Sequence, residues 1–582
     1  MTKLTINGIK IEVAEGTTIL EAAKAAKMSI PTLCHHPDLP ATAACGICVV
    51  KVKGRGNLVR SCASPVEEGM EVTTHDPEIV RVRRTILELI LSSHPNECLT
   101  CLRNESCELQ TLAAEFGIKE ESFPPLISDH PLDDSTRSIV LDPRKCIKCG
   151  RCITVCQVKQ NVWALSFLDR GIDTRISPAG DIKLSESPCI RCGQCSAHCP
   201  VGAITEYDQT GEVWEALSDP ATYCVAQIAP SIRVSIGEAF GYEPGTNVSG
   251  QVYDALRRMG FDAVFDTNFG ADVTIMEEAT EFAERFKNAP ETLPLITTCC
   301  PAWVDFMEKF HSEMIPYFSS CKSPQSILGV LAKTYYAGQR QLDPARIFMV
   351  SIMPCTAKKY EIHRHRTMFA SGRQDVDVSI TSRELIRMIR QSGLEFSGLD
   401  CLTAADSPLG EYSGAGTIFG ATGGVMEAAL RSAYYFVSGR DLTDPVIPAA
   451  RGIEGVKEGE IAIDGKPVRF AVAHGLANVE KVLEKITAAR ERGEEPPYHF
   501  VEVMACPGGC IGGGGQAWKV DDSIRECRAA GLLKDDAIRE CRASYKNPSI
   551  EKLYRDFLGE PLGEKARQLL HTTYRPRTRY RR

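Results

Sequence analysis

Alternating apolar and polar residues open the chain. The segment LTINGIKIEV, residues 4–13, places apolar side chains at every second position on each side of Asn7-Gly8. A period of two predicts two strands, and Asn-Gly is typical of a tight hairpin turn. Thr18 and Glu21 form a capping-box pattern at the start of ILEAAKAAKM, which predicts a helix. A hairpin followed by a helix and a long loop indicates a β-grasp-like unit.

The apolar period changes further along the chain. Residues 81–117, RVRRTILELILSSHPNECLTCLRNESCELQTLAAEFG, predict two helices that bracket a cysteine-containing loop. From about residue 210, segments such as VSGQVYDALRRMGFDAVFDTNFGAD and AVAHGLANVEKVLEKI alternate apolar strands with amphipathic helices. This alternation predicts a large α/β domain. With 582 residues the chain exceeds one core, so we expect an α+β multidomain protein.

Charge and composition narrow the class of protein. Lys plus Arg number 67 and Asp plus Glu 75, which gives a net charge of −8 and argues against a nucleic-acid partner. No uncharged apolar run reaches about 18 residues and no signal-peptide pattern opens the chain, so we expect no membrane span and a cytoplasmic location. Only the tail YRPRTRYRR is strongly basic, and we expect a solvated terminus there.

The 25 cysteines are the main chemical signal. In a reducing compartment clustered cysteines point to metal or redox chemistry rather than to disulfides. The first group comprises Cys34, Cys45, Cys48 and Cys62. Four thiolates suit structural zinc or a 2Fe-2S cluster, and the ligand count alone leaves both open. The small residues between these ligands favour the larger cluster.

The second group combines one histidine with three cysteines: His94, Cys98, Cys101 and Cys107. This composition fits a zinc ribbon and also a histidine-ligated 4Fe-4S cluster. A third interpretation is that His94 merely caps a helix.

Two further runs have the spacing of a bacterial two-cluster ferredoxin, CIKCGRCITVC and CIRCGQCSAHCP. Three closely spaced cysteines hold three corners of a cubane, and the fourth cysteine of each run ligates the other cluster. We therefore assign one 4Fe-4S centre to Cys146, Cys149, Cys152 and Cys199, and a second to Cys189, Cys192, Cys195 and Cys156.

Three isolated cysteine motifs interrupt the α/β half: TTCCPAW, MPCTAKKYE and EVMACPGGCIGGGGQ. They offer one or two thiols each, as expected of a buried site that is assembled from several loops. No GK[ST] follows the glycine run, so a phosphate loop is excluded.

Together these motifs resemble FeFe-hydrogenases over nearly the whole chain, and the resemblance implies clusters rather than zinc at both ambiguous sites. It implies a 2Fe-2S ferredoxin-like domain at 1–78, a His/Cys₃ 4Fe-4S domain at 79–126, a two-cluster domain at 127–209 and a catalytic domain at 210–582. The catalytic domain would hold the H-cluster, a 4Fe-4S cubane bridged to a diiron unit with CO, cyanide and dithiolate ligands. The matching cubane ligands are Cys300, Cys355, Cys506 and Cys510, of which Cys510 would also bind the diiron unit.

The resemblance also implies roles for residues around the H-cluster. Cys299 matches the proton carrier, and Ser319, Glu278, Glu281 and Arg285 match the relay to solvent; on the residues alone, the last three are an ordinary helical charge stripe. Lys358, Pro230 and Ser231 match partners of the cyanides. Gln325, Met353, Met504 and Phe419 are expected to line the cavity, although Met and Phe are also ordinary core residues.

The implied reaction is reversible heterolysis of dihydrogen, with electrons carried by one 2Fe-2S and three accessory 4Fe-4S clusters. Expected partners are ferredoxin or flavoprotein subunits that use NAD(P)H, in a hetero-oligomer, because residues 1–209 also resemble the large peripheral subunit of respiratory NADH dehydrogenase. Thr298, Ala517 and Cys321 depart from the family pattern, and none is an expected ligand. The alternative is a hydrogenase-like electron-transfer, sensory or iron-sulfur assembly subunit that turns over no hydrogen.

Overall fold

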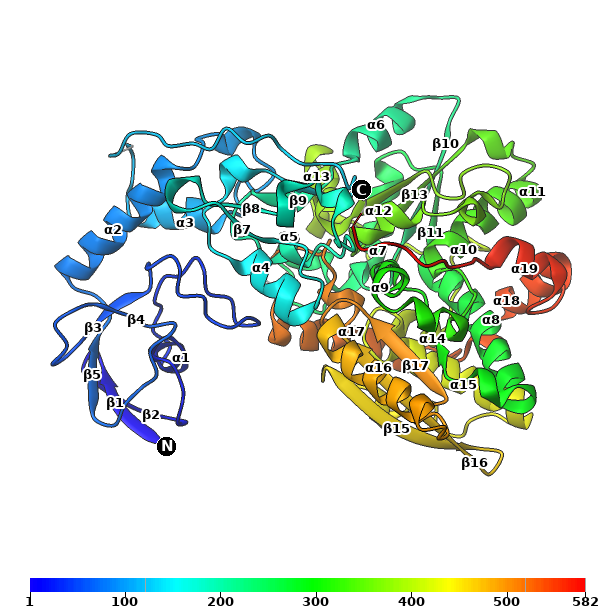
Figure 1. Ribbon diagram of the computed structural model, residues 1–582. Helices are drawn as coiled ribbons and strands as arrows, with labels where there is room; N and C mark the ends of the chain where they lie inside the picture. The colour runs from blue at the N-terminus through cyan, green and yellow to red at the C-terminus, as the bar shows by residue number, and fades with distance from the viewer. Residues whose placement is uncertain (121, 519, 581–582) are drawn as a thin grey trace.

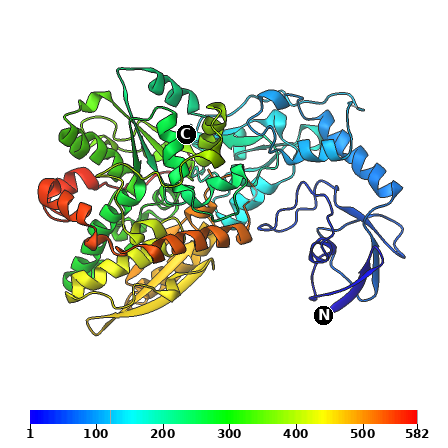
Figure 2. The same cartoon turned by 180° about the vertical axis from the view of Figure 1, so that it is seen from behind.

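The N-terminal lobe, the cysteine-rich middle of the chain and the large C-terminal body follow one another in space. The computed structural model describes residues 1–120, 122–518 and 520–580 (Figure 1). A small N-terminal lobe lies at one end, and the helices α18 (Pro548–Leu553) and α19 (Glu564–Leu570) lie at the other end of a large C-terminal body (Figure 2). The predicted multidomain architecture is therefore confirmed.

The N-terminal lobe is a five-stranded sheet in the order β2-β1-β5-β3-β4, with helix α1 packed on it. Its strands are β1 (Thr2–Ile6), β2 (Ile9–Val13), β3 (Val49–Val52), β4 (Val59–Arg60) and β5 (Met70–Thr73). Asn7 and Gly8 have φ of 49° and 83°, the positive values that a two-residue turn requires. The capping box of Thr18 and Glu21 starts α1 (Ile19–Ala25), which ends three residues earlier than the pattern predicted because Lys27 takes a positive φ. The β-grasp prediction is confirmed.

The middle of the chain contains short elements around cysteine-rich loops. Helices α2 (Pro77–Ser92) and α3 (Glu108–Glu115) bracket the loop that carries the second cysteine group, as predicted. Further on, β6 (Ile139–Leu141) pairs antiparallel with β9 (Ile204–Glu206), and these strands enclose the two ferredoxin-like runs. Each run leads into a short helix, α4 (Arg151–Thr154) or α5 (Gln194–His198), through a glycine with positive φ.

Two four-stranded sheets form the C-terminal body. The first contains β11 (Ala263–Asp266), β10 (Tyr223–Ile228), β13 (Ile347–Met353) and β14 (Val378–Thr381), all parallel. The second contains β12 (Leu295–Ile296), β17 (Phe500–Met504), β16 (Lys466–His474) and the antiparallel edge strand β15 (Val456–Ile463). Helices such as α8 (Thr267–Asn288) and α15 (Gly424–Ser438) pack against them. The α/β prediction is confirmed.

The carboxyl ends of these strands place the cysteine motifs. Cys299 and Cys300 follow β12, Cys355 follows β13, and Cys506 follows β17. Ligands in α/β proteins commonly bind at the carboxyl ends of parallel strands, where loops from several strands meet. The topology therefore brings motifs that are about 200 residues apart in sequence to one region.

The C-terminal segment returns across the body instead of projecting into solvent. Thr572 is buried, the Tyr574 hydroxyl donates to the Ser319 carbonyl oxygen at 3.0 Å, and Arg577 forms an ion pair with Asp305. The expectation of a solvated tail is therefore wrong for Tyr574 and Arg577, whereas Arg575, Pro576 and residues 578–580 are exposed as expected. Residues 581 and 582 lie outside the described residues. Within the described ranges, no helix is both long and apolar enough to cross a membrane.

Candidate active site and cluster sites

A cavity lies where the strand ends of the two sheets meet. Its volume is about 70 Å³. The predicted residues that line it are Cys299, Cys300, Cys355, Cys506, Cys510, Pro230, Gln325, Met353, Lys358, Phe419 and Met504. Thr267, Ala271 and Pro324 line it as well. Ser231 does not line it, and its hydroxyl accepts a hydrogen bond from Gln516 at 3.3 Å.

The four thiols expected to hold a cubane converge on this cavity. Burial raises the pKa of Cys355 and of Cys510 to about 12 and that of Cys506 well above its ordinary value. Cys300 is the N-cap of α9 (Pro301–Phe310), where backbone N–H groups partly oppose the same rise. Such thiols keep their protons unless a metal displaces them. Four soft sulfur donors in a buried, mainly apolar cavity fit an iron-sulfur cluster.

Lys358 is the cation of this cavity. Its Nζ donates to Glu361 Oε2 at 2.8 Å and to the Cys299 carbonyl oxygen at 3.1 Å. The same Glu361 oxygen accepts from the Gln325 amide and the Ser323 hydroxyl, both at 3.0 Å. One buried carboxylate therefore fixes two predicted cavity residues, and it keeps the pKa of Lys358 above its ordinary value although burial opposes this.

Cys299 projects into the cavity from the same segment as Cys300 and is not one of the expected cluster ligands. Its pKa is raised well above the ordinary value by burial and then by the nearby Glu278 carboxylate. Glu278 lies on α8 with no exposed surface, and neither of its carboxylate oxygens makes a well-formed hydrogen bond. Burial raises the pKa of Glu278 to about 8, and the Ser319 hydroxyl opposes the shift.

The remaining members of the expected relay continue toward the outside. Arg285 Nη2 donates to Glu281 Oε1 at 2.6 Å and to the Phe318 carbonyl oxygen at 3.0 Å, next to Ser319. The second Glu281 oxygen is buried without a partner. The structure thus brings Cys299, Glu278, Ser319, Glu281 and Arg285 into one sequence of neighbouring groups. The sequence predicted that Glu278, Glu281 and Arg285 share one helix face. The fold brings Ser319 to them from another segment.

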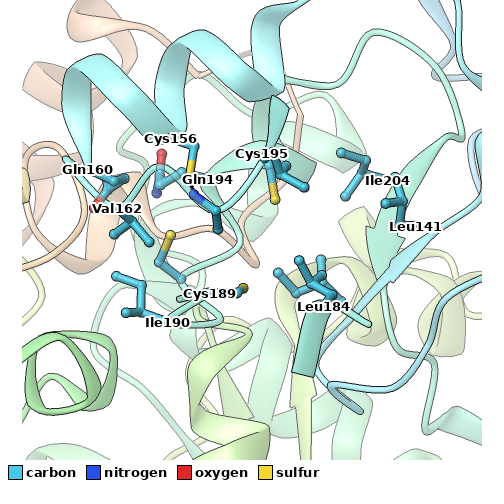
Figure 3. A pocket seen from close by; sticks show the side chains of 14 residues that line it. Leu141, Cys156, Gln160, Val162, Leu184, Cys189, Ile190, Gln194, Cys195 and Ile204 are labelled. Carbon is cyan, nitrogen blue, oxygen red and sulfur yellow. Dashed lines mark hydrogen bonds between the residues drawn. The ribbon is translucent and has the colours of Figure 1, made fainter. Parts of the chain in front are cut away.

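The two ferredoxin-like runs exchange their fourth cysteines. Cys156, Cys189, Cys192 and Cys195 surround a small cavity of about 30 Å³ (Figure 3). In the other group, burial and the charge of Cys199 together raise the pKa of Cys146 to about 11 and that of Cys149 to about 12. Both groupings match the expected ligand sets.

The structure assembles the first cysteine group and brings together part of the second. The thiols of Cys48 and Cys62 lie 3.4 Å apart, and hydrogen bonds from Cys45 and Cys62 lower the pKa of Cys34. In the second group His94 is half-buried with its Nδ1 unpartnered, and burial, followed by a small contribution from the charge of Cys101, raises the pKa of Cys107. Cys98 is exposed on a single turn.

Three residues that the sequence interpretation missed support these sites, and the first two of them connect one site to another. Thr42 donates to the Cys149 carbonyl oxygen at 3.2 Å, from the loop between Cys34 and Cys45. Gln194 lines the cavity of Figure 3, donates to the Gly512 carbonyl oxygen at 3.0 Å, and opposes the burial-driven rise in the pKa of Cys506. Glu361 is the third. Only Glu361 had a sequence signal, its position three residues after Lys358.

One further group of metal-binding residue types lies outside these sites. The ligand atoms of His36, Asp38 and His198 lie within 4.8 Å of one another. Arg525 from helix α17 (Asp522–Ile538) forms an ion pair with Asp38, so a cation already occupies this carboxylate. We interpret the group as a contact between the N-terminal lobe, the two-cluster region and the body.

The fold and the sites define an iron-sulfur oxidoreductase in which a series of cysteine groups leads to one buried cavity. Comparison with protein families matches the description "Iron only hydrogenase large subunit, C-terminal domain" over residues 222–514 and "Iron hydrogenase small subunit" over 522–577. A 2Fe-2S binding domain matches 1–77, the NADH-ubiquinone oxidoreductase-G iron-sulfur binding region 83–122, and a 4Fe-4S dicluster domain 145–203. The chain belongs to the iron-only, or FeFe, hydrogenase family.

Individual relatives include hydrogenases and one iron-sulfur assembly component. The chain is 44% identical to the NADP-reducing hydrogenase subunit HndD of Solidesulfovibrio fructosivorans over 100% of both chains. It is 38% identical to iron hydrogenase 1 of Clostridium pasteurianum over 99% of this chain and 100% of that one. A solved structure of apo [FeFe]-hydrogenase HydA1 from Chlamydomonas reinhardtii superposes with a TM-score of 0.56 at 39% identity, over 63% of this chain and 99% of that chain. Cytosolic iron-sulfur assembly component 3 of Mus musculus is 32% identical over 62% of this chain and 76% of its own length.

Proposed function

We propose that the protein is the catalytic subunit of a hydrogenase that interconverts dihydrogen with protons and electrons, and that its electron partner is NAD(P)-linked. The observation that carries this proposal is the cavity at which Cys300, Cys355, Cys506 and Cys510 converge while Cys299 remains free beside them. A purely structural or electron-transfer cluster needs four ligands and has no use for a fifth buried thiol next to a buried carboxyl group.

The H-cluster is the proposed cofactor of this cavity, held by the four converging thiols. When bound, it supplies the iron site at which dihydrogen is cleaved or formed. Lys358 provides a fixed positive charge for anionic ligands of the diiron unit, and Met353, Phe419 and Met504 exclude water. Low polarity strengthens such charge interactions.

Protons move through side chains of this chain in the proposed mechanism. The Cys299 thiol exchanges a proton with the cavity on one side and with Glu278 on the other. A carboxyl group with a pKa of about 8 is well suited to both accept and donate near neutral pH. Ser319 and Glu281 pass the proton outward, and Arg285 holds the Glu281 carboxylate in place.

Electrons enter or leave through one 2Fe-2S and three 4Fe-4S clusters in this proposal. Gln194 and Gly512 join the Cys189 group to the catalytic cavity, and Thr42 joins the Cys34 group to the Cys146 group. The similarity to an NADP-reducing hydrogenase subunit supports a hetero-oligomer with an NADP-linked partner. Flavoprotein subunits that oxidise NAD(P)H, with ferredoxin as a further partner, complete the proposal. Low-potential clusters and free thiols favour a cytoplasmic location.

The competing function is iron-sulfur cluster assembly, favoured by the partial similarity to cytosolic iron-sulfur assembly component 3. Infrared spectroscopy of anaerobically purified, fully matured protein tests between the two, because metal-bound CO and cyanide absorb apart from protein bands. Bands that shift under hydrogen, together with hydrogen evolution from a reduced dye, are the expected result. Their absence in protein that had met its maturation machinery would reject the hydrogenase proposal and favour the assembly function.

A further inference from the structure

Arg103 is a buried cation that has no counter-ion among the described residues. It lies between Cys101 and Cys107 with 2% of its surface exposed. Its Nη2 donates to the Ser106 carbonyl oxygen at 2.9 Å, while Nε and Nη1 are buried without a partner. Within residues 1–120, 122–518 and 520–580, no carboxylate forms an ion pair with it. Its guanidinium instead lies 4.0 Å from the ring centre of Trp518.

The groups that face Arg103 belong to two different cysteine sites. Burial lowers the pKa of Arg103 to about 10, and the charges of Cys199 and then Cys107 are the main influences that oppose this. Cys107 belongs to the His94 group and Cys199 to the Cys146 group. A side chain added at Gly202, three residues after Cys199, would meet both Cys101 Sγ and Arg103 Cγ. Arg103 therefore packs against the segment that follows Cys199 while it belongs to the loop of the His94 group, and so it lies between two of the proposed 4Fe-4S sites.

Arg83 occupies an equivalent position beside the first cysteine group. It lies on α2 with 5% of its surface exposed, its Nη2 donates to the Val49 carbonyl oxygen at 2.7 Å, and its Nε is buried without a partner. Burial lowers its pKa, and the charge of Cys48 opposes the shift. Arg151 shows the usual alternative, because it is also buried but pairs with both oxygens of Glu108 at 2.8 and 2.9 Å.

A buried, unpaired guanidinium is unfavourable unless a negative group lies nearby. Iron-sulfur clusters held by thiolates carry net negative charge, and their reduction adds another electron. Net charge and hydrogen bonds to the sulfurs are among the properties that set cluster potentials. A fixed cation beside a cluster thus favours its reduced state.

We propose that Arg83 and Arg103 are the counter-ions of the clusters and that each raises the reduction potential of the sites it faces. Arg83 acts on the 2Fe-2S site, and Arg103 acts on both the His94 site and the Cys146 site. By placing one positive charge between two clusters, Arg103 also reduces the repulsion between them when both are reduced. The inference rests on the cluster assignments of the proposed function.

Redox titration followed by electron paramagnetic resonance tests this in the full-length, cluster-loaded protein. Arg103→Gln should lower the potentials of two 4Fe-4S signals and leave the 2Fe-2S signal unchanged, and Arg83→Gln should do the reverse. We expect at least a tenfold change in the ratio of reduced to oxidised cluster at a given potential, which is 59 mV for one electron. Arg103→Lys, which keeps the charge, should retain most of the wild-type potentials.

Two results would overturn the proposal. One is that neither substitution changes any cluster potential; the other is an equal shift of every cluster potential, as a general distortion of the protein would cause. If iron and sulfide analysis shows that Arg103→Gln has lost its clusters, the Arg83→Gln titration becomes the test. An unchanged 2Fe-2S potential in that variant would then reject the proposal that a buried arginine raises the potential of a cluster. Wild-type protein without one 2Fe-2S and three accessory 4Fe-4S signals would instead refute the proposed cofactor set, so the two failures are distinguishable.

Discussion

The hydroxyl of Thr42 donates a hydrogen bond to the carbonyl oxygen of Cys149 at 3.2 Å. Thr42 belongs to the loop that carries Cys34 and Cys45, and it contributes a small part of the lowering of the pKa of Cys34, after Cys45 and Cys62 themselves. A single side chain therefore touches ligands of two proposed clusters. This relationship makes the Cys146 group the direct neighbour of the 2Fe-2S site.

Thr42→Val should slow electron transfer from the 2Fe-2S site while leaving both clusters in place. The substitution keeps the shape of the side chain and removes one hydrogen bond, worth about 1 kcal/mol, between the two segments. Rapid mixing with a reductant, followed by the absorbance of the 2Fe-2S site, would measure the rate. His94→Ala is the comparison, since it should disturb the other 4Fe-4S site and spare this step. A Thr42→Val rate equal to that of the wild type would remove Thr42 from the path.

Cys299→Ser should abolish most turnover without loss of iron. A serine hydroxyl is a far weaker acid than a thiol, and removal of a positioned proton-transfer group typically costs about 10²-fold or more. Hydrogen evolution and the infrared bands of the cofactor would be measured together. Cys321→Ser is the matched control, because Cys321 is also buried and lies beside Ser319 but does not line the cavity. A Cys299→Ser enzyme with near-normal turnover would disprove the carrier role.

Sequence patterns anticipated the elements and the grouping of the cysteines better than the contacts between them. The Asn7-Gly8 turn and the spacing that places Cys156 with Cys189, Cys192 and Cys195 follow local rules, and the structure agrees with both. The sequence patterns did not identify Glu361 and Thr42, because both residues act through partners that only the fold brings close. Gln325 is 36 residues from Glu361, and Cys149 is 107 residues from Thr42.

The limits of pattern reading are also clear at Ser231 and at the C-terminal tail. Ser231 follows Pro230 directly, yet only Pro230 lines the cavity, and the Ser231 hydroxyl accepts a hydrogen bond from Gln516. The tail is basic, but Arg577 meets the carboxylate of Asp305 on the body. In both cases the side chain contacts a partner from a distant segment, which the local pattern does not reveal.

The pH dependence of proton transfer should report Glu278. Its pKa is raised from 4.5 to about 8, mainly by burial, so the group holds its proton at pH 7 and loses it as the pH rises through about 8. Folding takes up a proton between these two values, and the stability contributed by this group therefore falls as the pH rises across that window. Hydrogen evolution should decline in the same range.

Infrared difference spectra against pH would follow the carbonyl stretch of the protonated Glu278 carboxyl group directly. The band should be present at pH 7, disappear above about pH 8, and be missing in Glu278→Gln. Glu281→Gln is the control, because it should lower turnover while leaving this band in place. A band that titrates near pH 4.5 would show that Glu278 is ionised at neutral pH and would exclude it as a proton donor there.

Glu361→Gln should separate the support of the cavity from the general stability of the protein. Glu361 Oε2 accepts from Lys358, Gln325 and Ser323, so loss of its charge leaves Lys358 without its counter-ion. Removing one partner of a buried ion pair typically costs about 3–5 kcal/mol. We expect lower stability, shifted cofactor infrared bands and reduced turnover.

The neighbouring lysine provides the control for that experiment. Lys359 forms an even more deeply buried pair with Glu384 at 2.9 Å, and neither residue lines the cavity. Glu384→Gln should therefore destabilise the protein to a similar extent in denaturant unfolding while leaving the infrared bands where they are. Only a shift confined to Glu361→Gln fits a specific action of the Lys358–Glu361 pair on the cofactor. Equal shifts in both variants would mean that any loss of a buried carboxylate in this region distorts the cavity, and the specific role of Lys358 would fall.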